Sequence, residues 1–546
     1  MGDTITAARP TREALGLADI VLPVLLFGGT AVYLAGLPRN LGAADEAIYL
    51  YEAKRVLAGQ VMYRDIFEIV TPGWVWLMAV LFRVFGTDLA TARIATAVLH
   101  GATAALVYLT CRRLEVRRGL SWPPALAYLV VCESAWSMAS QHWLATFLFV
   151  LLLWMLAGRP RGHPTGALLP GVVLGLLIAV QQPRGLVMAL GVFVWQLVDD
   201  GLRRRYRPGP PAVPVVVHLV TLVAGALLIV VPLGVIVIAD AGAGRVWRAL
   251  VIHPLVNYGG TTRCAWGYVN IMTAWNGSFT FPRLLTFLPA LLAVSAGRLA
   301  WLWLRRREQT EARVLGLLVL FCLAAMASIA YFPDFIHIAF IAPAFFVAIA
   351  ETCEWVVRRV AVPDGFRRAA GAATAAVFLL ACALHLRSNM VRLRETFPLT
   401  RRTAFGRVDY ADGIDVRLYD RVVELVRDAP SRELFCYPVV ANLYLTVGAE
   451  NPTPYGFFVA GYNSPDQVAE VLDILETRKV RTLVVLPGFA PPGDPVLEYV
   501  ERAYEPVAGG DVPERVIYRR RGAGVSDPEV HTGEHARPRH AFGWRS

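Results

Sequence analysis

Apolar runs of roughly 20 residues alternate with short polar loops over the first 385 residues of the chain. Each run can cross a hydrocarbon core about 30 Å thick as a helix, because a helix satisfies its own backbone hydrogen bonds where no water is present. The pattern predicts about eleven spans: Asp19 to Leu37, Leu89 to Cys111, Leu120 to Ala135, Ser140 to Leu156, Gly166 to Val180, Gly185 to Val198, Val213 to Ile238, Leu284 to Trp303, Val314 to Tyr331, Ile338 to Val357 and Ala369 to His385. We therefore expect a polytopic α-helical membrane protein.

Arginines gather in alternate loops, which predicts the topology. The arginine-rich loops are Arg112 to Arg118, the segment from Gly158, Arg203 to Arg207, Arg305 to Arg313 and Arg358 to Arg368. The turns near Ser137, Gln182 and Pro333 carry almost none. By the positive-inside rule the arginine-rich loops and the N-terminus are cytoplasmic, and the first loop, residues 240–283 and everything after His385 are extracytoplasmic. No small-residue cleavage site follows the first run, so we expect it to be retained.

The composition becomes that of a soluble domain after His385. Helical periodicity covers 419–427 and 464–477, the second with Ser464 as its cap, and short buried strands are expected at 433–440 and 482–486. This alternation predicts a small α/β layer structure. We divide the chain into a transmembrane domain (1–386), an extracytoplasmic α/β domain (387–521) and a disordered tail rich in Gly, Pro, Arg and His (522–546).

Composition and charge limit the class of protein. The 546 residues are 56% hydrophobic and 17% charged, with a mean hydropathy of +0.49, which excludes an ordinary soluble domain. The net charge of +11 lies in short loops and not along one face, so it does not indicate nucleic acid. The arginine- and alanine-rich style favours a bacterial inner membrane. Of seven cysteines only Cys264 and Cys436 fall in long outer segments, where a disulfide between them is one alternative, and no metal-binding spacing is present.

An adjacent acid pair, Asp45 and Glu46, follows the first predicted span. One interpretation is a helix cap, because acids suit the positive end of a helix from Ala47 to Ala58. The alternative is a functional site at the membrane interface, where water and a polar substrate reach the carboxylates. The helix is amphipathic and we expect it to lie on the membrane. The following segment, YRDIFE, supplies Arg64, Asp65 and Glu68 to what we predict is one aqueous pocket.

The order of residues in this region resembles a known family. The matching residues are Asp45, Glu46, Gly59, Tyr63, Asp65, Pro72, Gly86, Ala92 and Arg93. The order is similar to the first outer loop and second span of GT-C glycosyltransferases, in particular the family-39-like group with protein O-mannosyltransferases and aminoarabinose transferases. Weaker similarities follow in QQPRG (181–185), FPDFIHIAFIAP (332–343) and NLYLTVGAENPTPYGF (442–457).

The resemblance implies a GT-C fold and an inverting transfer from a polyprenyl-phosphate sugar to a cell-envelope glycan, lipid or protein. We expect Asp45 to act as the general base, with Glu46 or Asp65 orienting the acceptor or a metal. Arg184 and Arg64 are the candidates for binding the donor phosphate. No cofactor is required, although Asp45, Glu46 and Asp65 can supply oxygen ligands to a divalent cation.

Weaker candidates for substrate binding are Glu68, His253, Asn257, Tyr258, Arg263 and His337. Arg184 has an alternative role, snorkelling to lipid headgroups. His337 also has an alternative role, as a hydrogen-bonded residue at the start of a helix. The whole protein has two alternatives as well: a transporter or flippase for lipid-linked sugars, and a non-catalytic envelope scaffold. Transporters often have internal repeats and interrupted spans. The sequence shows neither feature, so it does not favour transport.

Overall fold

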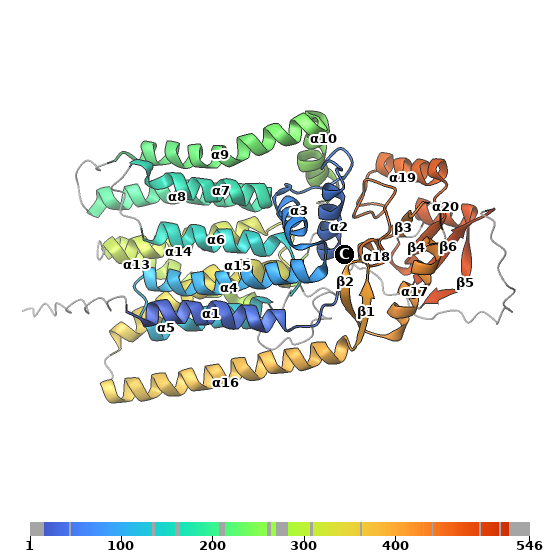
Figure 1. Ribbon diagram of the computed structural model, residues 1–546. Coiled ribbons are helices and arrows are strands. Elements are labelled where there is room, and N and C mark those ends of the chain that lie inside the picture. The colour runs from blue at the N-terminus through green and yellow to red at the C-terminus, as the bar shows by residue number, and fades with distance from the viewer. Residues whose placement is uncertain are drawn as a thin grey trace, which may run out of the picture.

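A bundle of long helices forms one end of the molecule and a small sheet-containing domain the other (Figure 1). The computed structural model describes residues 16–42, 45–133, 137–158, 164–206, 213–258, 264–268, 282–305, 309–360, 363–427, 429, 431–438, 440–490, 493–512 and 515–522. The long helices of the bundle are α1 (Ala18–Ala35), α4 (Leu89–Arg113), α6 (Gln141–Ala157), α7 (Leu168–Val180), α8 (Gln182–Tyr206), α9 (Val215–Ala241), α13 (Leu288–Arg305), α14 (Gln309–Ser328), α15 (Phe335–Arg359) and α16 (Asp364–Thr396). A shorter helix, α5 (Arg118–Ala127), continues into the π-helix η1 (Tyr128–Glu133).

Within these described ranges, eight helices are long and apolar enough to span a membrane: α1, α4, α8, α9, α13, α14, α15 and α16. The chain is therefore a multi-pass membrane protein. The other three predicted spans coincide with α6, α7 and the α5–η1 pair, which are shorter. The helix starts on the side of the sheet domain are capped as their sequences suggest: Asp88 accepts from Ala90 N, Ser140 from His142 N, and Asp334 from His337 N.

The two helices of the first loop differ from each other in burial. α2 (Asp45–Leu57) does not lie exposed on a membrane surface, since nine of its residues are buried. α3 (Gly73–Phe85) instead exposes Leu77, Val80, Val84 and Phe85. The second domain covers part of α2, a contact that periodicity does not reveal.

The last long helix, α16, runs along one side of the bundle and leads into the second domain (Figure 1). It extends to Thr396, about ten residues beyond the domain boundary expected from composition. The hairpin β1 (Leu399–Thr403) and β2 (Gly406–Tyr410) follows and contacts the start of α4, where Leu89 N donates to Phe405 O.

A four-stranded sheet organises the second domain. Its strand order is β3 (Leu434–Tyr437), β4 (Thr482–Val485), β6 (Arg515–Arg520) and β5 (Tyr504–Val512), with β3 and β4 parallel and the other pairs antiparallel. The helices are α17 (Gly413–Arg427), α18 (Ala441–Val447), α19 (Pro465–Arg478) and α20 (Pro495–Ala503). The predicted strands and helices are thus present, and Ser464 caps α19 in a capping box with Gln467. Both Cys264 and Cys436 are free, so the disulfide alternative is wrong.

α2 lies between the bundle and the second domain and joins them (Figure 1). The Tyr51 ring stacks on Tyr444 of α18 at 4.9 Å between centroids, and the Tyr51 hydroxyl accepts from Asn451 N at 2.7 Å. Phe67 N donates to Pro454 O at 2.8 Å. These contacts hold the second domain over the end of the bundle that carries the first loop.

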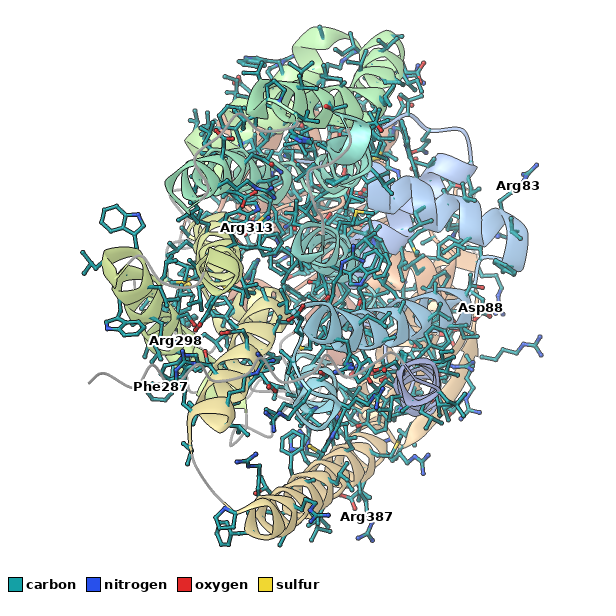
Figure 2. All side chains as sticks on the ribbon, turned by 90° about the vertical axis from the view of Figure 1, so that its left-hand side faces the viewer. Arg83, Asp88, Phe287, Arg298, Arg313 and Arg387 are labelled. Atoms are coloured by element: carbon teal, nitrogen blue, oxygen red, sulfur yellow. The ribbon has the colours of Figure 1, made fainter. Side chains whose placement is uncertain are left out.

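Several ion pairs join residues of the bundle, and Arg298, which takes part in two of them, is labelled in Figure 2. Asp19 pairs with Arg112 and Arg118, Glu354 with Arg117 and Arg358, and Arg298 with Glu311 and Glu351. Arginines in and beside the predicted cytoplasmic loops therefore also bind neighbouring elements of the bundle together.

Candidate active site

Asp45, the first residue of α2, lies beside the start of α15. Its carboxyl is partly buried and interacts electrostatically with His337, Asp334 and Tyr331. Burial raises the pKa of Asp45, and the neighbouring Asp334 adds to this effect whereas His337 opposes it. Asp45 is thus a carboxylate of increased basicity at the junction of the first loop and the bundle.

His337 is held by the residue that caps its own helix. Asp334 Oδ1 accepts from His337 N at 2.8 Å and lies 2.7 Å from His337 Nδ1. The His337 ring also packs edge-on against His142 of α6, with 5.1 Å between centroids. The helix-start role considered from the sequence is therefore present, and the same contact fixes the imidazole beside Asp45.

Arg184 lies in the first turn of α8 and is only 1% exposed. Its Nη1 is 3.5 Å from the carbonyl oxygen of His142, and the guanidinium carbon is 5.9 Å from the centre of the Phe340 ring. Within the described residues its Nε and Nη2 have no hydrogen-bond partner. A snorkelling arginine would be exposed at the membrane surface, so that alternative is wrong.

Tyr331 interacts electrostatically with both Asp45 and Arg184. Burial raises the pKa of Tyr331 to about 12. Beside it, Gln181 Nε2 contacts His142 Nδ1 at 3.0 Å. The structure therefore gathers Asp45, His337 and Arg184 around one tyrosine, although they come from α2, α15 and α8.

Glu46 has a different environment from Asp45. It is completely buried, pairs with Arg93 of α4 at 2.9 Å and accepts from Ala139 N at 2.8 Å and Gly42 N at 3.4 Å. These contacts indicate that Glu46 fastens the first loop to the bundle. Its contact with the acceptor or a metal stays a prediction.

Arg64 and Asp65 form a pair on the surface. Arg64 Nη2 is 2.9 Å from Asp65 Oδ2, which also accepts from Val61 N at 2.8 Å. The partners of Asp65 in the described structure do not include Asp45, so the predicted common pocket is not formed by this pair. The predicted metal set of Asp45, Glu46 and Asp65 is not assembled, and within the described residues no group of three or more His, Cys, Asp or Glu could hold an ion.

Glu68 does lie near Asp45, with which it interacts electrostatically. His253, between the π-helices η3 (Arg248–Ile252) and η4 (Pro254–Tyr258), is buried between the rings of Phe67 and Tyr462, each about 5.0 Å away between centroids. Asn257 is partly buried in η4. The side chain of Tyr258 and all of Arg263 lie outside the described residues.

Sequence reasoning did not select Tyr331, His142 and Tyr462. His142 and Tyr331 lie at the ends of apolar runs. A polar side chain at such an end, on the same predicted side of the membrane as the first loop, could have indicated a site residue. Tyr462 comes from the second domain and interacts with Asp45 and Glu68 across the domain junction. No local pattern could have indicated that contact.

Comparison with known proteins identifies the fold. No protein-family model matches the chain, and no curated protein does. ArnT from Cupriavidus metallidurans bound to undecaprenyl phosphate is similar over 94% of this chain and 98% of its own, with a TM-score of 0.55 and 15% identity. This chain has the fold of ArnT. The predicted GT-C architecture with a small C-terminal sheet domain is thereby confirmed.

Two further solved structures are similar. The apo structure of the same ArnT gives a TM-score of 0.51 at 15% identity, over 91% of this chain and 97% of that one. Arabinofuranosyltransferase AftD from Mycobacteria gives a TM-score of 0.48 at 16% identity, over 94% of this chain and 40% of that one.

Proposed function

We propose that the protein is a membrane glycosyltransferase that moves a sugar from a polyprenyl-phosphate donor to a hydroxyl group of a cell-envelope glycan, lipid or protein. The observation that carries this proposal is the placement of two groups around Tyr331: the carboxylate of Asp45 and the buried guanidinium of Arg184, whose Nε and Nη2 have no partner among the described residues. A structure with the same fold is bound to undecaprenyl phosphate. The chemistry of the site fits a phosphate-linked lipid.

In the proposed reaction the acceptor hydroxyl attacks the anomeric carbon while Asp45 takes its proton. The bond between the anomeric carbon and the phosphate oxygen breaks, and its electron pair stays on the departing polyprenyl phosphate. Arg184 stabilises this charge with its Nε and Nη2 N–H groups, which need no reorganisation because no acceptor among the described residues occupies them. A single displacement of this kind inverts the configuration. Arg64 stays a predicted second contact to the donor phosphate.

We place the reaction on the outer face of a bacterial inner membrane, with the N-terminus in the cytoplasm. The arginine-rich loops of the sequence support this orientation, because positive charge favours the cytoplasmic side. A reporter fused near Gln60 should be extracytoplasmic. A cytoplasmic signal there would contradict the orientation.

The decisive experiment incubates the purified protein with a panel of labelled polyprenyl-phosphate sugars and candidate acceptors. We expect Asp45→Asn to lower kcat by about 100-fold or more, because a positioned base contributes about 10² to 10⁴. Since burial raises the pKa of Asp45, the rate should also fall with decreasing pH at a value above the usual aspartate range.

The matched control is Asp420→Asn, on the exposed face of α17. It should transfer sugar at the rate of the unaltered protein. Asp45→Asn that folds normally and retains kcat within about threefold would refute the catalytic role. Binding of a donor with no transfer to any acceptor would favour transport.

A further inference from the structure

A second pair of carboxyl groups, Glu52 and Glu68, lies beside Asp45. Glu52 of α2 is 0% exposed, and within the described structure neither of its oxygens meets an N–H or O–H donor. Glu68 is 7% exposed, and its Oε1 accepts from Ile69 N at 2.7 Å and Val70 N at 3.1 Å. The two carboxyl groups interact directly, so that a hydrogen bond can join them when one of them is protonated.

A hydrogen bond between two carboxyl groups requires a proton, because two carboxylates only accept. An ionised carboxylate buried without donors is strongly disfavoured, and two neighbouring carboxyls cannot both be ionised at low cost. Glu68 has two backbone donors and Glu52 has none, so the proton belongs mainly to Glu52. Burial, with the charge of Glu68, holds the pKa of Glu52 well above its usual range, and burial raises the pKa of Glu68 to about 7.

The pair is connected to Asp45 along one face of α2. Asp45, Tyr49 and Glu52 are spaced by four and then three residues, which places them on the same side of the helix. Tyr49 interacts electrostatically with Asp45, Glu52 and Glu68, and its hydroxyl accepts from Gln141 Nε2 at 3.0 Å.

The other elements packed against the pair complete its surroundings. Arg55 of α2 interacts with Glu52, and Tyr63 of the first loop interacts with both carboxyls. From the second domain, Tyr462 interacts with Glu68, and a Cβ at Gly456 would lie only 3.1 Å from Glu52 Oε1. The second domain therefore closes directly over the carboxyl pair and separates it from solvent.

We propose that Glu52 and Glu68 share one proton and act together as positioning residues for Asp45, supplying one fixed negative charge beside the base. This inference rests on the proposed function. The charge on Glu68 makes the Asp45 carboxylate a stronger base, because a neighbouring negative charge favours proton uptake. Glu52 keeps that charge single, and Tyr49 stands between Asp45 and Glu52 on the same face of α2.

Kinetics test the effect on the base. Glu68→Gln keeps the size of the side chain and an oxygen for Ile69 N and Val70 N, but removes the charge. We expect kcat at about pH 8 to fall about tenfold with little change in donor KM, because one negative charge beside the base is lost. Glu68→Asp should recover most of kcat. Glu424→Gln, exposed on α17, is the matched control.

Infrared spectroscopy tests the shared proton without any substrate. The unaltered protein should show a carboxylic-acid C=O band at about pH 8 that is absent in Glu52→Gln and present in Glu424→Gln. A band that persists in Glu52→Gln, or a Glu68→Gln variant with unchanged kcat, would overturn the proposal. If no donor supports transfer, the positioning role falls together with the proposed function, whereas the infrared result still decides whether the pair shares a proton.

Discussion

Replacing Arg184 by methionine is expected to lower sugar transfer and raise thermal stability in the same variant. The side chain is 1% exposed, and its Nε and Nη2 have no partner among the described residues. In the folded protein without donor these N–H groups are desolvated without compensation, a cost of about 1–3 kcal/mol. Methionine fills similar space and has no polar hydrogen to satisfy.

The expected loss of activity follows from the same two groups. A hydrogen bond to a charged phosphate contributes about 1.5–3 kcal/mol, so losing about 3 kcal/mol of transition-state stabilisation lowers kcat/KM about 150-fold. The gain in stability should raise the unfolding midpoint by roughly 2 °C. Added polyprenyl phosphate should raise the midpoint of the unaltered protein but not that of Arg184→Met.

The assay combines initial rates over a range of donor concentrations with thermal unfolding in detergent. Arg83→Met is the matched control, since Arg83 is exposed on α3 and extends away from the helices (Figure 2). A loss of both activity and stability in Arg184→Met would show that the guanidinium holds the fold together. Unchanged kcat/KM would remove Arg184 from the donor site.

Two further predictions concern the attachment of the first loop. Glu46→Gln leaves the Arg93 guanidinium, which pairs with Glu46 at 2.9 Å, without its buried counter-charge. We expect the unfolding free energy to fall by about 3–5 kcal/mol, measured by thermal unfolding with Glu424→Gln as the control. An unchanged unfolding midpoint would contradict the structural role of Glu46. Tyr51→Phe removes the hydroxyl that accepts a hydrogen bond from Asn451 N. We expect a loss of about 1–2 kcal/mol in local stability, which should speed hydrogen exchange at residues 449–455 without changing it in the bundle. Equal exchange rates in the variant and the unaltered protein would show that this bond does not hold the second domain in place.

Local sequence pattern determined the elements of this protein. Runs of apolar residues located the long helices, because a span must satisfy its backbone internally wherever the lipid supplies no partner. Ser464 and Gln467 marked the start of α19, since a capping box is made by residues three positions apart. Asp45 and Arg184 could be selected because charges at the ends of apolar runs are conspicuous.

Only the tertiary structure decided which of these residues meet and which side chains are buried. The charged residues of the first loop have three different environments. Asp45 lies near His337, Glu46 pairs with Arg93 in the interior, and Arg64 and Asp65 form a pair on the surface. The burial of α2 and the covering of Glu52 by Gly456 depend on a domain some 400 residues further along the chain. Periodicity reports the environment of one element, whereas a site assembled from α2, α8, α15 and the second domain depends on packing between elements, which no single segment encodes.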